Sequence, residues 1–249
     1  HRGIDQKLSK VLVFLTSKQN LGGIEQTISE LQKLSDGHDN SLEIDLEFAR
    51  ALCNLTNKQE LEGIEQTISQ LQKLSDRHSS HQKIELVLAK ALVNKTVKQD
   101  LDSIEQTIYQ LQILSNRHDC DPEIDLRLAE ALFNKTIEQD IGAIEQTISR
   151  LKKLSAHHDS YPKIDLRLAK AMVNKTIKQD PSGIRQTVSQ LQKLSSRYQN
   201  QYRFEIEVMI GLWNLSEQQN PKDVIKTANR LNDRIQEIKT GKEALILLL

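Results

Sequence analysis

The sequence predicts an all-α fold, a right-handed α-solenoid of six 40-residue helix-turn-helix repeats with about twelve helices. The tetrapeptide Ile24-Glu25-Gln26-Thr27 recurs at a step of 40 residues without an insertion, and such a fixed period indicates a repeat architecture. Apolar residues within each period fall at helical spacing. Aromatic residues make up only 4% of the chain and charged residues 27%, which is typical of a helix-rich chain with a thin core.

The repeat boundaries follow from aligning the recurring blocks. The predicted repeats are 1–40, 41–80, 81–120, 121–160, 161–200 and 201–240, and together they form one helical-repeat domain over residues 1–240. We expect residues 241–249 to begin a C-terminal capping helix or a following helix.

The first helix of a repeat is expected over about 42–57 in the second repeat. Ile44, Phe48 and Leu52 belong to one apolar stripe, and Leu46 and Cys53 extend it around well over half of the helix. A helix that is apolar on so many sides must be covered by several neighbours.

The second helix of a repeat is expected over about 61–77, where apolar residues again recur at helical spacing. Asp180-Pro181 supplies an N-cap and a proline at the first helical position of the fifth copy. Glycine recurs early in this helix, at Gly23, Gly63 and Gly183, which predicts close packing there. The short loops make successive helices antiparallel neighbours, and stacked pairs share a continuous core.

One stretch resembles a degenerate tetratricopeptide repeat. It is Leu86 to Leu92, followed by the small residue Ser103 before Ile104, and Pro122 and Pro162 match a proline that often follows the second helix in that family. The period departs from the family's length of about 34 residues, and HEAT or armadillo repeats remain the alternative. The resemblance implies that peptides or partner domains bind in a concave groove lined by the first helices.

A polar strip on the first helices is the candidate site for such a partner. An asparagine row could hydrogen-bond the backbone of a ligand, and neighbouring cations could hold carboxylates. Alternatively, the asparagines bridge adjacent helices and face no ligand. The row departs from asparagine at Phe14, and Glu130 and Ile210 interrupt the row of cations. The candidate groove residues are Asn54, Asn94, Asn134, Asn174, Asn214, Lys10, Arg50, Lys90, Lys170, Arg127 and Arg167.

Two other recurring patterns have structural interpretations. The asparagines also form glycosylation sequons, which we interpret as a by-product of the repeat. Histidines recur near the end of the second helices, but stacked repeats hold them too far apart to share one ion. We therefore expect no metal site, and we expect each imidazole to meet free carbonyl groups at a helix C-terminus. These histidines are His38, His78, His118 and His158.

The sequence contains no recognisable catalytic motif. There is no glycine-rich phosphate loop and no convergent acid–base pair, Cys53 falls in an apolar arc, and we expect neither an enzyme nor a cofactor. The 34 basic and 34 acidic residues cancel, which makes a nucleic-acid partner unlikely. Two cysteines fit a reducing compartment, so a cytoplasmic location is expected, and no apolar run is long enough for a membrane span.

The leading functional prediction is a non-catalytic scaffold that binds a protein or peptide. The first residue, His1, and the abrupt apolar end suggest the recognition or sensor region of a larger protein. Two alternatives stay open. The chain could be a nucleic-acid-binding helical repeat that reads RNA, or a structural spacer that self-associates through its C-terminal apolar end.

Overall fold

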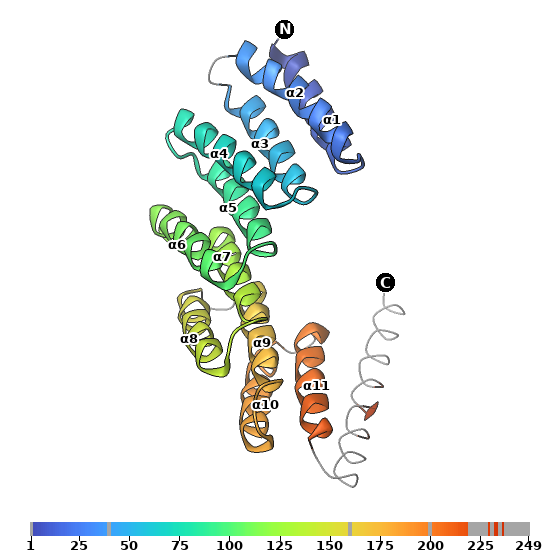
Figure 1. Cartoon of the computed structure of the whole chain (residues 1–249), viewed down its shortest axis with the longest axis vertical. Coiled ribbons are helices and arrows are strands. Elements are labelled where there is room, and N and C mark those ends of the chain that lie inside the picture. The colour runs from blue at the N-terminus through green and yellow to red at the C-terminus, as the bar shows by residue number, and fades with distance from the viewer. Residues whose placement is uncertain are drawn as a thin grey trace. The chain divides into compact units, whose positions relative to one another are not determined.

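The computed structural model describes residues 2–38, 41–158, 161–198 and 201–218, together with residues 229, 232, 233 and 236. These residues form eleven helices and contain no strand (Figure 1). The first helices of the repeats are α1 (Arg2–Thr16), α3 (Leu42–Thr56), α5 (Gln82–Thr96), α7 (Pro122–Lys135), α9 (Pro162–Thr176) and α11 (Tyr202–Glu217). The second helices are α2 (Leu21–Gly37), α4 (Leu61–Arg77), α6 (Leu101–Arg117), α8 (Ile141–His157) and α10 (Pro181–Ser195).

The helices confirm the predicted all-helical repeat fold. The bounds of α3 and α4 agree with the expected ranges 42–57 and 61–77, and the first helices begin at a constant step of 40 residues. The second helix that is expected in 201–240, and the helix that is expected from 241, lie outside the described residues.

Local capping explains why the second helices begin where they do. The side chains of Asn20, Asp100, Asp140 and Asp180 each accept a hydrogen bond from the backbone N–H three residues later, at 2.8–3.0 Å. This contact satisfies one of the N–H groups that have no partner inside the helix. A capping side chain therefore sets the start of four of the five described second helices, and Glu60 before α4 makes no such bond.

The recurring glycine of the second helix lies close to one glutamine side chain, and the recurring threonine donates a hydrogen bond to the same glutamine. Thr27 donates a hydrogen bond to Gln19 Oε1, and a Cβ atom added at Gly23 would lie 3.2 Å from the Gln19 side chain. Thr67, Thr107, Thr147 and Thr187 donate to the equivalent glutamines. The glycine is closely packed, as predicted, but not against a neighbouring helix. It makes room for a side chain of the preceding turn.

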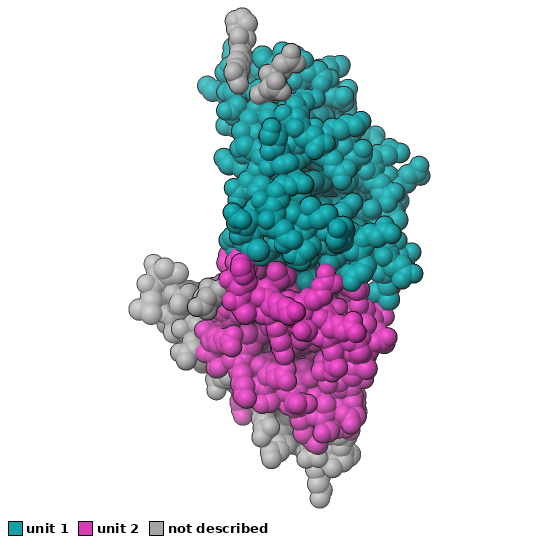
Figure 2. All heavy atoms as spheres, turned by 90° about the vertical axis from the view of Figure 1, so that its left-hand side faces the viewer, with its two compact units in different colours: residues 1–134 teal, residues 135–249 magenta. Residues whose placement is uncertain are grey.

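Contacts divide the chain into two compact units, residues 1–134 and 135–249, which Figure 2 shows in teal and magenta. In the first unit, α1 packs on α3 and α3 on α5, while α2 lies against both α1 and α3 and α4 against both α3 and α5. In the second unit, α9 packs on α11, and α10 lies against both. Helices α3, α5 and α9 are therefore each covered on more than one side, as their broad apolar surfaces require.

Candidate functional site

The asparagine row of the predicted groove bridges consecutive repeats. Asn94 Nδ2 donates to Thr56 Oγ1 at 2.8 Å, so the amide of α5 is bound to the end of α3. The other four asparagines bind the threonine 38 residues earlier at 2.7–2.8 Å. They are Asn54, Asn134, Asn174 and Asn214. The geometry thus favours the bridging alternative for the amide nitrogens, and a groove role for these residues stays a prediction.

The threonines in this row have a second bond. Thr56 Oγ1 accepts from Asn94 and donates to the Cys53 carbonyl oxygen at 2.7 Å, within its own helix. The two polar residues of each Asn-x-Thr triplet therefore serve opposite sides of one repeat. The asparagine donates a hydrogen bond to the repeat before it, and the threonine accepts a hydrogen bond from the repeat after it. This use explains why the triplet recurs at the C-terminal end of the first helices.

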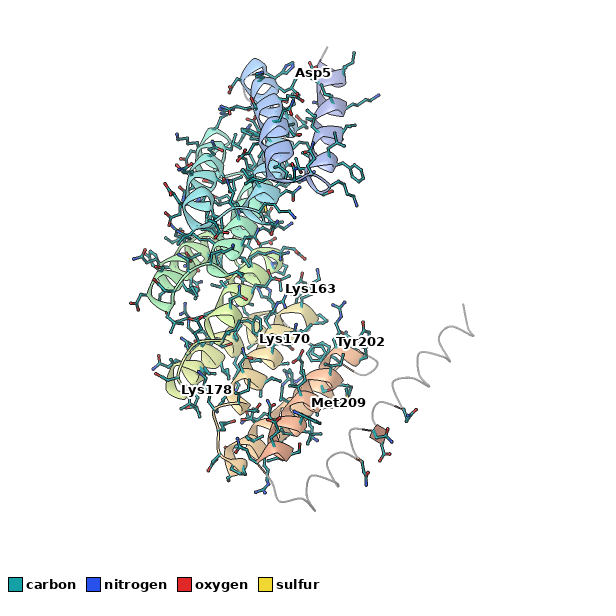
Figure 3. All side chains as sticks on the ribbon, turned by 45° about the vertical axis from the view of Figure 1, so that its right-hand side comes forward. Asp5, Lys163, Lys170, Lys178, Tyr202 and Met209 are labelled. Carbon is teal, nitrogen blue, oxygen red and sulfur yellow. The ribbon has the colours of Figure 1, made fainter. Side chains whose placement is uncertain are left out.

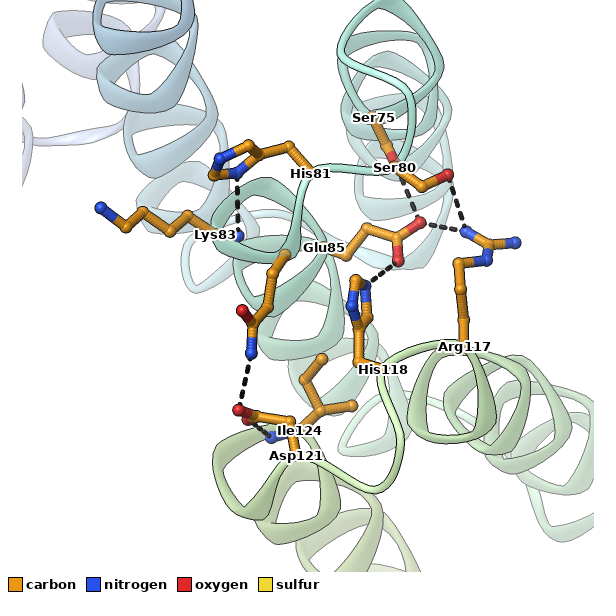
Figure 4. Close-up of polar contacts among 10 residues, drawn as sticks. Ser75, Ser80, His81, Lys83, Glu85, Arg117, His118, Asp121 and Ile124 are labelled. Atoms are coloured by element: carbon orange, nitrogen blue, oxygen red, sulfur yellow. Dashed lines mark hydrogen bonds and ion pairs between the residues drawn. The ribbon is translucent and has the colours of Figure 1, made fainter.

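A second polar cluster surrounds a carboxylate near the start of the first helices, which is buried in α3, α5, α7 and α9. Glu85 Oε1 accepts from Ser75 at 3.0 Å, and Glu85 Oε2 lies 2.5 Å from His118 Nε2 (Figure 4). Arg117 completes the cluster through an ion pair with the same carboxylate. Ser75 belongs to α4, whereas Arg117 ends α6 and His118 directly follows it, so one carboxylate of α5 joins the ends of two second helices.

The same arrangement recurs in the first unit. Asp45 binds Ser35, Arg77 and His78, and the distance from Asp45 Oδ2 to His78 Nε2 is 2.7 Å. His38 binds Asp5 at 2.8 Å. The expectation that the imidazoles meet free carbonyl groups is therefore wrong for His38, His78 and His118, whose Nε2 atoms bind carboxylates of the first helices.

The fifth repeat has a tyrosine in place of the histidine of this cluster. Tyr198 Oη lies 2.5 Å from Asp165 Oδ2, at the positions that His118 and Glu85 occupy in the first unit. Within the part of the chain that the structure describes, no group of three His, Cys, Asp or Glu side chains could hold a metal ion. The recurring acids and histidines are thus used to join helices.

Two of the four predicted groove cations of the first unit pair with acids of their own helices. Arg50 pairs with Glu47 at 2.7 Å, and Arg127 pairs with Glu130 at 2.7 Å. Lys10 is exposed on α1. Burial raises the pKa of the Cys53 thiol to about 11, and the nearby charges of Lys90 and Arg127 offset part of that rise. These cations therefore belong to a strip of mixed sign.

The strip of the second unit is more basic. Lys163, Arg167 and Lys170 lie at positions i, i+4 and i+7 of α9, which places them on one face of the helix. Figure 3 labels Lys163 and Lys170 beside Tyr202 and Met209 of α11. The carboxyl of Glu207 on α11 is mostly buried, and this burial raises its pKa, while Lys170 and Arg167 act in the opposite direction.

Sequence reasoning missed two equivalent pockets between second helices. A pocket of about 300 Å³ lies over α4, α5 and α6, where Gln72, Ser75 and Arg117 are among its lining residues. Its counterpart over α8, α9 and α10 measures about 630 Å³, and Lys152 and Lys193 line it. The recurring serine and the cations of the second helices mark these pockets in the sequence. The pockets could not be predicted from them, because the pockets depend on how neighbouring second helices pack.

Comparison with known proteins adds support for the fold alone. No family model matches the sequence, and no curated protein matches it as a relative. An engineered protein whose crystal structure comes from the Northeast Structural Genomics Consortium is 20% identical, with a TM-score of 0.53 over 86% of this chain and 90% of that one. A second engineered protein from the same consortium is 19% identical, with a TM-score of 0.54 over 93% of this chain and 64% of the other.

A helix that crosses a membrane needs about 20 consecutive apolar residues, and the described helices do not meet this requirement. None of them is long and apolar enough to cross a membrane. From its helices, their packing and these structural neighbours, the chain is an all-helical repeat protein.

Proposed function

We propose that this chain is a non-catalytic scaffold that binds a protein or peptide through the polar strip of its first helices. One contrast carries the proposal. Polar residues that recur in most repeats, such as Asn94 and Thr56, bond one helix to another, whereas the strip charges change from repeat to repeat. Lys163 in α9 stands where α3 has Glu43, and Arg167 stands where α3 has Glu47. Such variation suits recognition of one particular ligand.

The ligand class that we propose is an acidic peptide segment bound at α9. Lys163, Arg167 and Lys170 present three cations on one face, and a guanidinium can hold a carboxylate through two parallel hydrogen bonds. Tyr202 and Met209 belong to α11, which packs on α9 (Figure 3), and side chains of these types can offer a ligand apolar contact. This binding mode agrees with the tetratricopeptide-like resemblance and with the recognition region of a larger cytoplasmic protein.

A peptide-display selection on the whole chain tests the proposal. We expect enriched peptides to be acidic and to lose at least about tenfold in affinity when Lys163, Arg167 and Lys170 are changed to Gln. The matched control changes three exposed lysines of second helices, Lys33, Lys73 and Lys153, so that the net charge is the same. Circular dichroism checks that each variant is folded.

The control separates specific recognition from a general charge effect. If both triple variants lose affinity equally, or if the selection enriches no acidic sequence, α9 is not a peptide site. Salt-sensitive binding of single-stranded RNA that competes with the peptide would also contradict the proposal and favour a nucleic-acid partner.

A further inference from the structure

The pocket over α8, α9 and α10, which we call the α8–α10 pocket, is larger than its counterpart over α4, α5 and α6. Its volume is about 630 Å³ against about 300 Å³, and it lies entirely within the second compact unit. Buried apolar side chains form part of its lining, namely Leu168, Met172 and Leu194, which are at most 6% exposed. A pocket of this volume, partly apolar and partly polar, suits a small organic ligand.

The ion pair of the smaller pocket is open in the α8–α10 pocket. Arg117 pairs with Glu85 in the smaller pocket, and Arg197 and Asp165 stand at the same two positions of the larger one. Among the described residues, Asp165 accepts a hydrogen bond only from Tyr198, and its Oδ1 atom has no partner. Arg197 likewise pairs with no acid in the described ranges. Its guanidinium is therefore available to a ligand.

Three replacements make the α8–α10 pocket more basic than its counterpart. They are Lys152 for Gln72, Lys193 for Ile113 and Ala156 for Asp76. The other four described second helices have glutamine at the position of Lys152, so this lysine departs from the repeat. Both lysines are exposed and pair with no acid among the described residues.

The charges of the α8–α10 pocket point to an anion with two negative charges. Lys152, Lys193 and Arg197 face one carboxylate, that of Asp165, so two positive charges are in excess. A phosphate monoester carries nearly two negative charges at neutral pH and has three strong acceptor oxygens. Guanidinium groups bind phosphate through parallel hydrogen bonds, and ammonium groups bind it as point charges.

We propose that the α8–α10 pocket binds a phosphate monoester of a small organic molecule. The phosphate contacts the three cations, and the organic part contacts Leu168 and Met172. At 100° per residue, these two residues and Asp165 lie on the other face of α9 from Lys163 and its neighbouring cations. The pocket is therefore a second site, separate from the proposed peptide site.

Titration calorimetry of the whole chain with phenyl phosphate tests this site. We expect saturable binding at one site, and binding of inorganic phosphate and of benzoate that is at least about tenfold weaker. Inorganic phosphate lacks the apolar body, and benzoate lacks the second charge. Changing Lys152 to Gln and Lys193 to Ile gives the pocket two residues of its counterpart, and should weaken phenyl phosphate binding at least about tenfold.

Two control variants separate the pocket from general charge effects and from the peptide site. The first changes Lys33 and Lys58, which are exposed outside the pocket, to Gln, so that the net charge equals that of the pocket variant. The second changes Lys163, Arg167 and Lys170 to Gln. Both should bind phenyl phosphate as the native chain does, and circular dichroism verifies that every variant is folded.

Four results overturn the phosphate site. The first is that phenyl phosphate shows no saturable binding at millimolar concentrations, as expected if Arg197 closes on Asp165 in the way that Arg117 closes on Glu85. The second is that inorganic phosphate or benzoate binds as tightly as phenyl phosphate. The third is that the folded pocket variant binds like the native chain. The last is that either control variant loses as much affinity as the pocket variant.

Discussion

At the scale of single residues, the recurring polar side chains act as connectors between helices. Thr56 accepts from Asn94 and donates to the Cys53 carbonyl, so one hydroxyl satisfies two groups. Glu85 is buried on α5 and receives donors from α4 and from the end of α6. A buried polar group stabilises the fold only when its partners are present, which makes each connector a sensitive position.

The Asn94–Thr56 bond should contribute measurably to stability. In a double-mutant cycle with Asn94→Ala and Thr56→Val, we expect a coupling free energy of about 1 kcal/mol, the usual net value of such a bond. Urea unfolding followed by circular dichroism measures it. Asn57→Ala is the control, because its amide makes only a long contact of 3.5 Å to Cys53, and should change little. Absence of coupling would mean that the bridge does not hold the repeats together.

The buried carboxylate of Glu85 should matter more than an exposed one. Glu85→Ala removes the common partner of Ser75, Arg117 and His118, and we expect a loss of about 3 kcal/mol in unfolding free energy. The exposed Glu60, which pairs with Lys98 on the surface, is the matched control, and Glu60→Ala should have no measurable effect. Equal effects of the two changes in thermal or urea unfolding would contradict a structural role for the cluster.

The Cys53 thiol should be unreactive in the folded chain. Its pKa of about 11 leaves almost no thiolate near neutral pH, and thiolate is the reactive form. In a Cys120→Ser variant, labelling with a maleimide should be slow when the chain is folded and fast in urea. Fast labelling of the folded variant would show that Cys53 is accessible and ionised.

At the scale of elements, the helices could be predicted because their period is visible in the sequence. The 3.6-residue spacing and the caps before α2 and α10 locate their starts closely. The partners of the histidines could not be predicted in this way. His78 meets Asp45 across 33 residues, and that contact depends on how α4 returns over the start of α3. The α9 cations were partly predicted, since Arg167 and Lys170 were named and Lys163 was not.

The turns between repeats contain a correctable strain. Cys120 has φ 58° in the loop between α6 and α7, a left-handed conformation that costs a non-glycine residue about 1 kcal/mol. Cys120→Gly should therefore raise the unfolding free energy by up to that amount. Val97→Gly is the control, because Val97 has φ −73°, and it should lower stability. Differential scanning calorimetry compares the two, and a lower melting temperature for Cys120→Gly would contradict the argument.

At the scale of the whole molecule, the residues that hold repeats together recur, and we propose that residues that vary between repeats bind a partner. Repeat arrays gain stability from interfaces between neighbours, so residues at those interfaces recur. The α9 strip is where the chain departs from its own repeat, with Lys163 in place of Glu43 and Arg167 in place of Glu47. Departures of this kind are the signal for function in a sequence whose repeated residues serve the fold.

The most direct test measures affinity and stability together for two variants of the whole chain. The first carries Asn94→Ala and Asn174→Ala, and the second carries Lys163→Gln and Lys170→Gln. With an acidic peptide from the selection, titration calorimetry should give an unchanged affinity and urea unfolding a lower stability for the first variant. The second should keep its stability and lose affinity. An asparagine variant that is folded but no longer binds the peptide, beside a lysine variant that binds it fully, would contradict the account.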